Sequence, residues 1–117
     1  MTVTVMHVAR AFSAQPTLSE CLDGMDVVEA PLPEALASGT LHPDVLWVSA
    51  ALPADVEALH VRYPGSRILA TPGRTASASD IVRLIARADL VLRDEGVVLA
   101  AAGVQVLCRR RTAVSVA

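Results

Sequence analysis

Ser49 carries a hydroxyl at the end of an apolar run, in the stretch DVLWVSAALP that spans residues 44–53. A serine hydroxyl becomes a nucleophile when a neighbouring base accepts its proton, and histidine commonly serves as that base. His7 lies in a second apolar run, TVTVMHV. If the two runs are neighbouring parallel strands, both side chains end near one sheet edge, where open α/β folds carry their active sites. No recognisable carboxylate orients His7, so we interpret Ser49 as a retained polar residue rather than a nucleophile.

Other residues with chemical potential give weaker signals. Cys21 and Cys108 are far apart and have no His or Cys near them at ligand spacing, so we expect no metal site and no cofactor. Both lie in helical patterns and are predicted to be reduced thiols packed as small hydrophobic groups. The stretch TPGRTASAS, residues 71–79, is rich in Gly, Ser and Thr but lacks the spacing of a P-loop. We interpret it as a connecting loop.

Composition limits the classes of function. The chain has 117 residues, enough for one domain, and is 53% hydrophobic but only 3% aromatic, so its core must be aliphatic. A net charge of −2 does not indicate the basic surface that nucleic-acid-binding proteins need. The chain has no lysine, which excludes lysine-based mechanisms. The N-terminus lacks the pattern of a signal peptide and no apolar run approaches about 20 residues, so we expect a cytoplasmic protein without membrane contact.

Strand and helix patterns alternate along the chain. β-Branched and apolar runs predict five strands, at Thr2–Val8, Met25–Ala30, Asp44–Ser49, Ser66–Thr71 and Asp89–Arg93. Helical patterns lie between them: Ser77 and Asp80 form a capping box before the fourth helix, and Asp94 is expected to cap a last helix that ends at the triple arginine 109–111. Apolar runs in the later strands imply burial on both faces. We predict a doubly wound α/β domain over residues 1–111, with 112–117 as a tail or the start of a linker.

Three motifs give the chain a resemblance to the receiver domain of bacterial response regulators. DVLWVSAALP resembles the third strand of a receiver, which ends in the phosphorylated aspartate and is followed by Leu-Pro. YPGSRILAT resembles the fourth strand with its terminal Thr or Ser, and ARADLVLRDEGVVLAAAGVQVL is similar to the fifth strand and last helix. The resemblance covers essentially the whole chain and is closest to receivers of LuxR-type helix-turn-helix regulators. It implies a flavodoxin-like, three-layer (βα)5 fold with a five-stranded parallel sheet.

The resemblance also implies a degenerate phosphorylation site. Receivers need an acceptor aspartate, an acidic pair after the first strand and a lysine after the fifth, because the carboxylates hold Mg²⁺ during phosphoryl transfer. Here Ser49 stands at the acceptor position and Arg93 at the lysine position. The acidic pair falls around residues 7–10, ahead of the first carboxylate, Glu20. Only Thr71 matches. We therefore expect a degenerate pocket formed by His7, Thr71 and Arg93 around Ser49, and no enzymatic activity.

Two surfaces are predicted to meet partners. In receivers the loop after the fourth strand, the next helix and the fifth strand form the output face, so the resemblance implies partner contacts for Arg74, Arg83 and Arg87. The last helix has two apolar stripes, and a sheet can cover only one of them. We expect the stripe of Leu99, Ala102 and Val106 to face the sheet. A homodimer is then predicted through the other stripe, which consists of Val97, Ala101, Val104 and Cys108.

The expected function is that of a phosphorylation-independent, receiver-like regulatory module of a bacterial transcriptional regulator or a stand-alone adaptor. It would respond to a protein partner or a small ligand. Contact with DNA is expected only through a domain beyond Ala117, if one exists. Two alternatives stay open: a small-molecule sensor that uses the vacated acidic pocket, lined by Met6, His7, Ser49 and Thr71, or an enzyme of another flavodoxin-like family.

Overall fold

A computed structural model describes residues 3–10, 22, 24–37, 42–93 and 96–116 of the chain. The strands are β1 (Thr4–Ala9), β2 (Asp26–Pro31), β3 (Val45–Ala51), β4 (Arg67–Pro72) and β5 (Leu90–Val91). The helices are α2 (Leu32–Ala37), α3 (Pro53–Arg62), α4 (Ala78–Arg87) and α5 (Val97–Val116). The predicted first helix with Cys21 and the predicted cap Asp94 lie outside the described residues.

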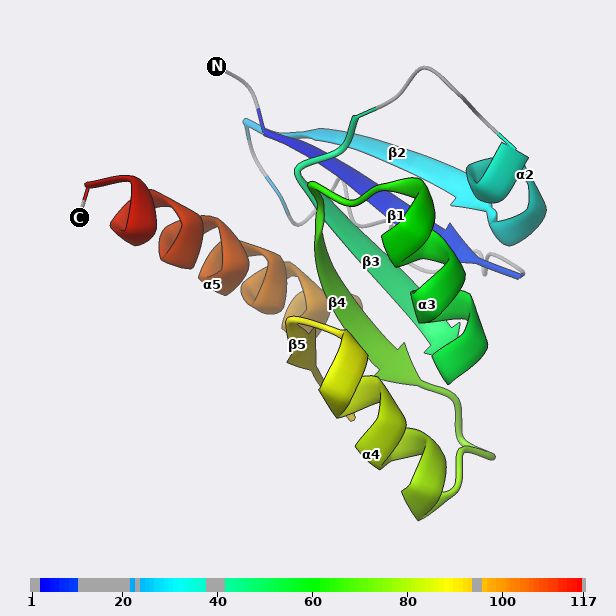
Figure 1. The fold of residues 1–117 in the computed structure, drawn as a ribbon. Coiled ribbons are helices and arrows are strands. Elements are labelled where there is room, and N and C mark those ends of the chain that lie inside the picture. The colour runs from blue at the N-terminus through cyan, green and yellow to red at the C-terminus, as the bar shows by residue number, and fades with distance from the viewer. Residues whose placement is uncertain (1–2, 11–21, 23, 38–41, 94–95, 117) are drawn as a thin grey trace.

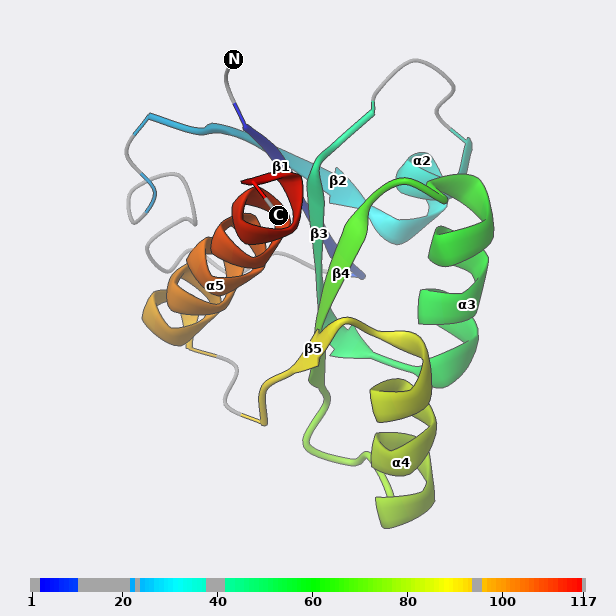
Figure 2. The same ribbon diagram turned by 60° about the vertical axis from the view of Figure 1, so that its left-hand side comes forward.

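The strands form one parallel sheet in the order β2-β1-β3-β4-β5. This is the doubly wound, flavodoxin-like order, so the predicted fold class is confirmed. Helices α2, α3 and α4 cover one face of the sheet and α5 covers the other (Figures 1 and 2). Among the helices in the described ranges, none combines the length and hydropathy that a membrane crossing requires.

Aliphatic side chains fill both interfaces between sheet and helices. On the side of α2, α3 and α4, the cluster includes Met6, Leu46, Leu59 and Leu84. On the side of α5, the cluster is built around Trp47. Successive side chains of a strand point to opposite faces, and both faces are covered here. This accounts for the near-continuous burial of β3 and β4.

Local signals set several element boundaries. The capping box predicted before α4 is present: the Asp80 amide donates to Ser77 Oγ over 3.1 Å and the Ser77 amide donates to Asp80 Oδ2 over 3.2 Å. Helix α3 starts at Pro53, because proline is well suited to the first turn of a helix. Strand β5 is shorter than predicted, and α5 continues past the triple arginine to Val116.

The prediction of the partner-facing stripe on α5 is wrong. Val104 and Ala101 are buried at 0% and 5% exposure in the cluster beneath α5, and Val97 and Cys108 are partly buried against it. The exposed apolar residues are instead Val98, Leu99 and Val106.

The physical reason for this difference is the close fit of α5 on the sheet. A Cβ placed on Gly103 would lie 3.0 Å from Leu92 Cδ1 and 3.1 Å from Leu69 Cδ2. The helix therefore approaches the sheet along its small residues, and in this orientation the side chain of Val104 points into the core.

Candidate functional site

The carboxyl ends of β1, β3 and β4 bring the predicted polar residues to one sheet edge. His7 pairs in register with Trp47, and Ser49 pairs with Thr71. Trp47 belongs to the cluster on the α5 side, and His7 stacks on it, so both side chains lie on that face. Met6, which was expected to line the same pocket, is buried in the cluster on the opposite face. Neighbouring positions in a strand alternate between faces, which separates Met6 from His7.

Ser49 and His7 form a hydrogen-bonded pair. His7 Nε2 and Ser49 Oγ lie 2.8 Å apart, and Ser49 Oγ is also 3.5 Å from the carbonyl oxygen of Val8. The His7 ring stacks on Trp47, with 3.9 Å between ring centroids and an interplanar angle of 11°. Burial lowers the pKa of His7 from 6.5 to about 4. The imidazole is therefore neutral at pH 7, and the serine and histidine form an uncharged pair.

Thr71 is fully buried, and its hydroxyl forms hydrogen bonds inside the sheet. Thr71 Oγ1 accepts a hydrogen bond from Trp47 Nε1 over 3.1 Å and donates to the carbonyl oxygen of Val48 over 3.4 Å. A receiver-type role would require this hydroxyl to be available at the sheet edge. Here the Thr71 hydroxyl accepts a hydrogen bond from the indole N–H of Trp47, so the two groups satisfy each other within the core.

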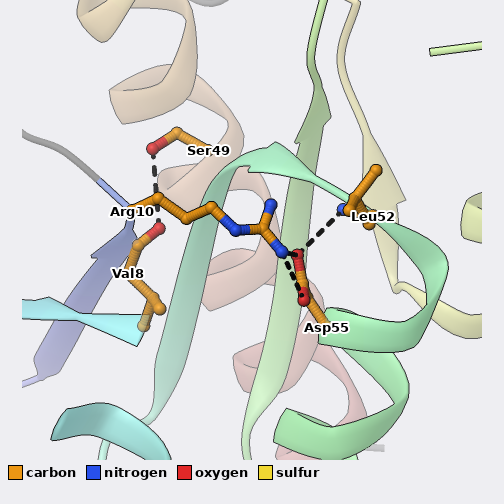
Figure 3. Close-up of polar contacts among 5 residues, drawn as sticks. All are labelled: Val8, Arg10, Ser49, Leu52 and Asp55. Carbon is orange, nitrogen blue, oxygen red and sulfur yellow. Dashed lines mark hydrogen bonds and ion pairs between the residues drawn. The ribbon is translucent and has the colours of Figure 1, made fainter. Parts of the chain in front are cut away.

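An ion pair lies next to Ser49 (Figure 3). Arg10 follows β1 and its Nη2 contacts Asp55 Oδ2 at 2.9 Å and Oδ1 at 3.0 Å. Asp55 belongs to the first turn of α3, and its Oδ2 also accepts from the Leu52 amide over 3.3 Å. The hollow between Arg10, Asp55 and Ser49 has no room for a water molecule. A cation and its carboxylate therefore close the space beside Ser49.

The described residues at this edge do not fit Mg²⁺. The ion prefers an octahedral set of oxygen ligands from carboxylates, carbonyls and water. Around Ser49 the only carboxylate that lines the described hollow is that of Asp55, and it is neutralised by Arg10. In the same described part of the chain, no three His, Cys, Asp or Glu side chains are grouped closely enough to hold a metal ion.

Sequence reasoning missed Trp47, Arg10 and Asp55. Trp47 stands two residues before Ser49, and that spacing on a strand places both on one face, so the signal was available. Asp55 follows Leu-Pro at the third helix position, where a carboxylate commonly caps the helix. The contact between Asp55 and Arg10 joins residues 45 positions apart and leaves no local pattern.

The backbone beside Ser49 is also unusual. Ala50 has a φ of 49°, and the pairing of β3 with β4 shifts register between Ser49 and Ala51. The left-handed region costs a residue with a Cβ roughly 1 kcal/mol. Nothing in the alanine side chain predicts it.

The remaining predicted residues lie elsewhere. Arg93 is exposed and lines a groove between α4 and β5, so its prediction as part of the pocket around Ser49 is wrong. The chain bends at Arg93, two residues after the end of the short β5, and the side chain lies on the side of α4. Arg74, Arg83 and Arg87 are exposed, as a partner surface requires. Arg87 Nη2 lies 3.7 Å from Glu57 on α3.

The fold is similar to that of a solved receiver domain. The receiver domain of the Francisella response regulator 1452 matches with a TM-score of 0.74 and 15% sequence identity, over 94% of this chain and 99% of that one. At this identity the likeness establishes the fold, which is a flavodoxin-like receiver fold. No family model and no curated protein matches the sequence.

Proposed function

We propose that this chain is a receiver-like regulatory module that works without aspartyl phosphorylation. The observation that carries the proposal is the uncharged Ser49–His7 pair at the acceptor position, with 2.8 Å between Oγ and Nε2. The receiver fold supports a regulatory role by analogy, either in a bacterial transcriptional regulator or in a stand-alone adaptor.

Phosphoryl transfer in receivers depends on free carboxylates that the described residues at this edge do not supply. A metal ion must neutralise the transferred group, and carboxylates must hold the metal. The carboxylate of Asp55 is already neutralised by Arg10 at 2.9 Å. The Thr71 hydroxyl, which matches the receiver pattern, donates to the Val48 carbonyl instead. These contacts favour a domain held in one state over one that is switched by phosphate.

We propose that the Ser49–His7 pair is not catalytic. A general base is most effective when its pKa lies near the working pH. A pKa of about 4 makes His7 a weak proton acceptor, and the closed hollow beside Ser49 offers no space for a substrate. The alternative of small-molecule sensing in the vacated pocket has the same difficulty. The hollow there is filled by the Arg10–Asp55 pair, and Met6 points to the other face.

The test is phosphorylation in vitro. The chain is incubated with acetyl phosphate and Mg²⁺, or with beryllofluoride and Mg²⁺, beside a phosphorylatable receiver as positive control. We expect unchanged intact mass and an unchanged amide NMR spectrum. Ser49→Ala serves as the matched variant: a Mg²⁺-dependent adduct on the wild type that disappears in this variant assigns the modification to Ser49. Such an adduct, or one on any aspartate, contradicts the proposal.

A further inference from the structure

An apolar groove lies between α4 and β5, at the edge of the sheet. Its volume is about 620 Å³, which falls within the roughly 300–1,000 Å³ of small-molecule sites. The aliphatic residues that line it are Ile81, Val82 and Ile85 from α4 and Leu90 and Val91 from β5. Figure 2 shows α4 beside this edge strand, on the side of the sheet opposite α5. The groove shares no lining residue with the hollow at the candidate site.

The walls of the groove are aliphatic and open to solvent. Val82 is 65% exposed and Ile85 is 60% exposed, whereas Leu84 on the neighbouring face of α4 is fully buried. None of the described lining residues is aromatic, so a flat ring bound here would have no ring to stack on. The walls therefore fit a saturated hydrocarbon chain better than an aromatic group.

The two charged residues of the groove differ in how their charges are compensated. Asp89 Oδ2 accepts a hydrogen bond from the Ile68 amide over 2.7 Å, and Asp89 Oδ1 lies 3.6 Å from Arg67 Nη1. The guanidinium of Arg93 is exposed, and within the described ranges it makes no ion pair. The groove thus offers one uncompensated charge, and that charge is positive.

This positive charge stands at one end of the groove. Asp89 precedes β5 and Arg93 follows it, so four residues, or roughly 13 Å of extended chain, separate the two ends. A saturated chain of about ten carbons has a similar length, because its bonds are near 1.5 Å and its angles near 111°. A guanidinium matches the planar carboxylate group with two parallel hydrogen bonds. The ligand that complements the groove in shape and charge is therefore a linear aliphatic acid.

We propose that the groove between α4 and β5 binds a free linear aliphatic carboxylic acid, with its chain along Ile85 and Val91 and its carboxylate on Arg93. The proposal goes beyond the function proposed above and does not rest on it, because the Ser49 site contributes no residue to the groove. Such a ligand supplies the module with an input other than phosphate.

The test is a titration of the ¹⁵N-labelled chain with decanoate, kept below its critical micelle concentration and followed by amide NMR. We expect saturable shifts in α4 and β5, with a Kd below about 1 mM. Decyltrimethylammonium, which carries the opposite charge on the same chain, should bind roughly tenfold more weakly or less. Acetate, which has the carboxylate without the chain, should cause no saturable shift. Circular dichroism at the same concentrations checks that the chain stays folded.

Variants test the two parts of the site separately. Arg93→Gln should weaken decanoate binding about tenfold, because the charged hydrogen bonds are lost, and should not weaken the binding of decyltrimethylammonium. Ile85→Asp places a carboxylate in the middle of the groove at an exposed position, so it should fold and weaken decanoate binding by roughly tenfold or more. Val61→Asp on α3 and Val98→Asp on α5 are matched controls, since both residues are 77% exposed outside the groove. Both should bind decanoate like the wild type.

The absence of saturable shifts with decanoate overturns the proposal. So does equal affinity for decanoate and decyltrimethylammonium, or an Arg93→Gln variant that binds decanoate like the wild type, since either result means that no carboxylate meets Arg93. Sedimentation equilibrium at the same chain concentration tests whether a second copy takes the groove instead. Self-association that Ile85→Asp abolishes and that decanoate does not reverse also contradicts the proposal.

Discussion

Ser49 and His7 form an uncharged pair, and burial of the imidazole is what keeps it neutral. The imidazole stacks on Trp47 and cannot be solvated on that side, so its charged form is disfavoured and its pKa falls to about 4. Arg10 and Asp55 then neutralise each other beside the pair. The described side chains at this edge therefore interact through hydrogen bonds and an ion pair.

Replacing Ser49 by aspartate should not restore phosphorylation. The metal-binding acids that receivers carry after β1 and the lysine that they carry after β5 are also missing, and Asp55 beside position 49 is already paired with Arg10. We expect no Mg²⁺-dependent adduct by mass spectrometry and a loss of stability of about 1 kcal/mol in urea denaturation, since a charge is partly desolvated. Ser49→Ala is the control without charge. Phosphorylation of the aspartate variant would show that acids from elsewhere complete the pocket.

The histidine predicts a dependence of stability on pH. The pKa of His7 is about 4 in the folded chain and near 6.5 when unfolded, so the unfolded chain binds the proton first as pH falls. The stability linked to neutral His7 is fully present above pH 6.5 and is lost as pH falls from 6.5 to 4. The loss is on the order of 2 kcal/mol, allowing for partial solvation of the ring.

Urea denaturation followed by circular dichroism at pH 7 and pH 5 measures this effect. His7→Gln has no titrating ring and should show a smaller difference between the two pH values than the wild type. Equal differences in both proteins would mean that His7 does not titrate as described.

In helix α5, packing rather than residue type decides which of the two apolar stripes faces the sheet. Both stripes look alike by residue type, and the close contact of Gly103 with Leu69 and Leu92 decides which one meets the sheet. Val104 is buried as a result and Val98 is exposed.

Val104→Asp should therefore unfold the domain or cost on the order of 3–5 kcal/mol, because an unpaired carboxylate enters the core. Val98→Asp, on the exposed side of the same helix, should change stability by no more than about 0.5 kcal/mol. Chemical denaturation of both variants is the measurement. A stably folded Val104→Asp variant would mean that the stripe of Val104 is accessible after all.

At the level of the whole molecule, the sheet was predictable and several of its contacts were not. Apolar runs alternate with helical patterns, which is enough to predict a doubly wound sheet and to bring His7 near Ser49. The Arg10–Asp55 pair joins the residue after β1 to the first turn of α3, and the φ of Ala50 depends on how β3 meets β4. Such features follow from tertiary geometry, for which the sequence carries no local signal. The position of the Arg93 side chain likewise depends on the residue at which β5 ends.

Trp47 is the only tryptophan of the chain, and it lies against His7 and Thr71 at the candidate site. The protein therefore contains a single indole fluorophore, and it lies at the candidate site. Its emission responds to the charge of the stacked imidazole and to the hydrogen bond of its own N–H. A change in the His7 contact or in the Thr71 hydrogen bond can therefore be followed by intrinsic fluorescence, without a label and without a second indole.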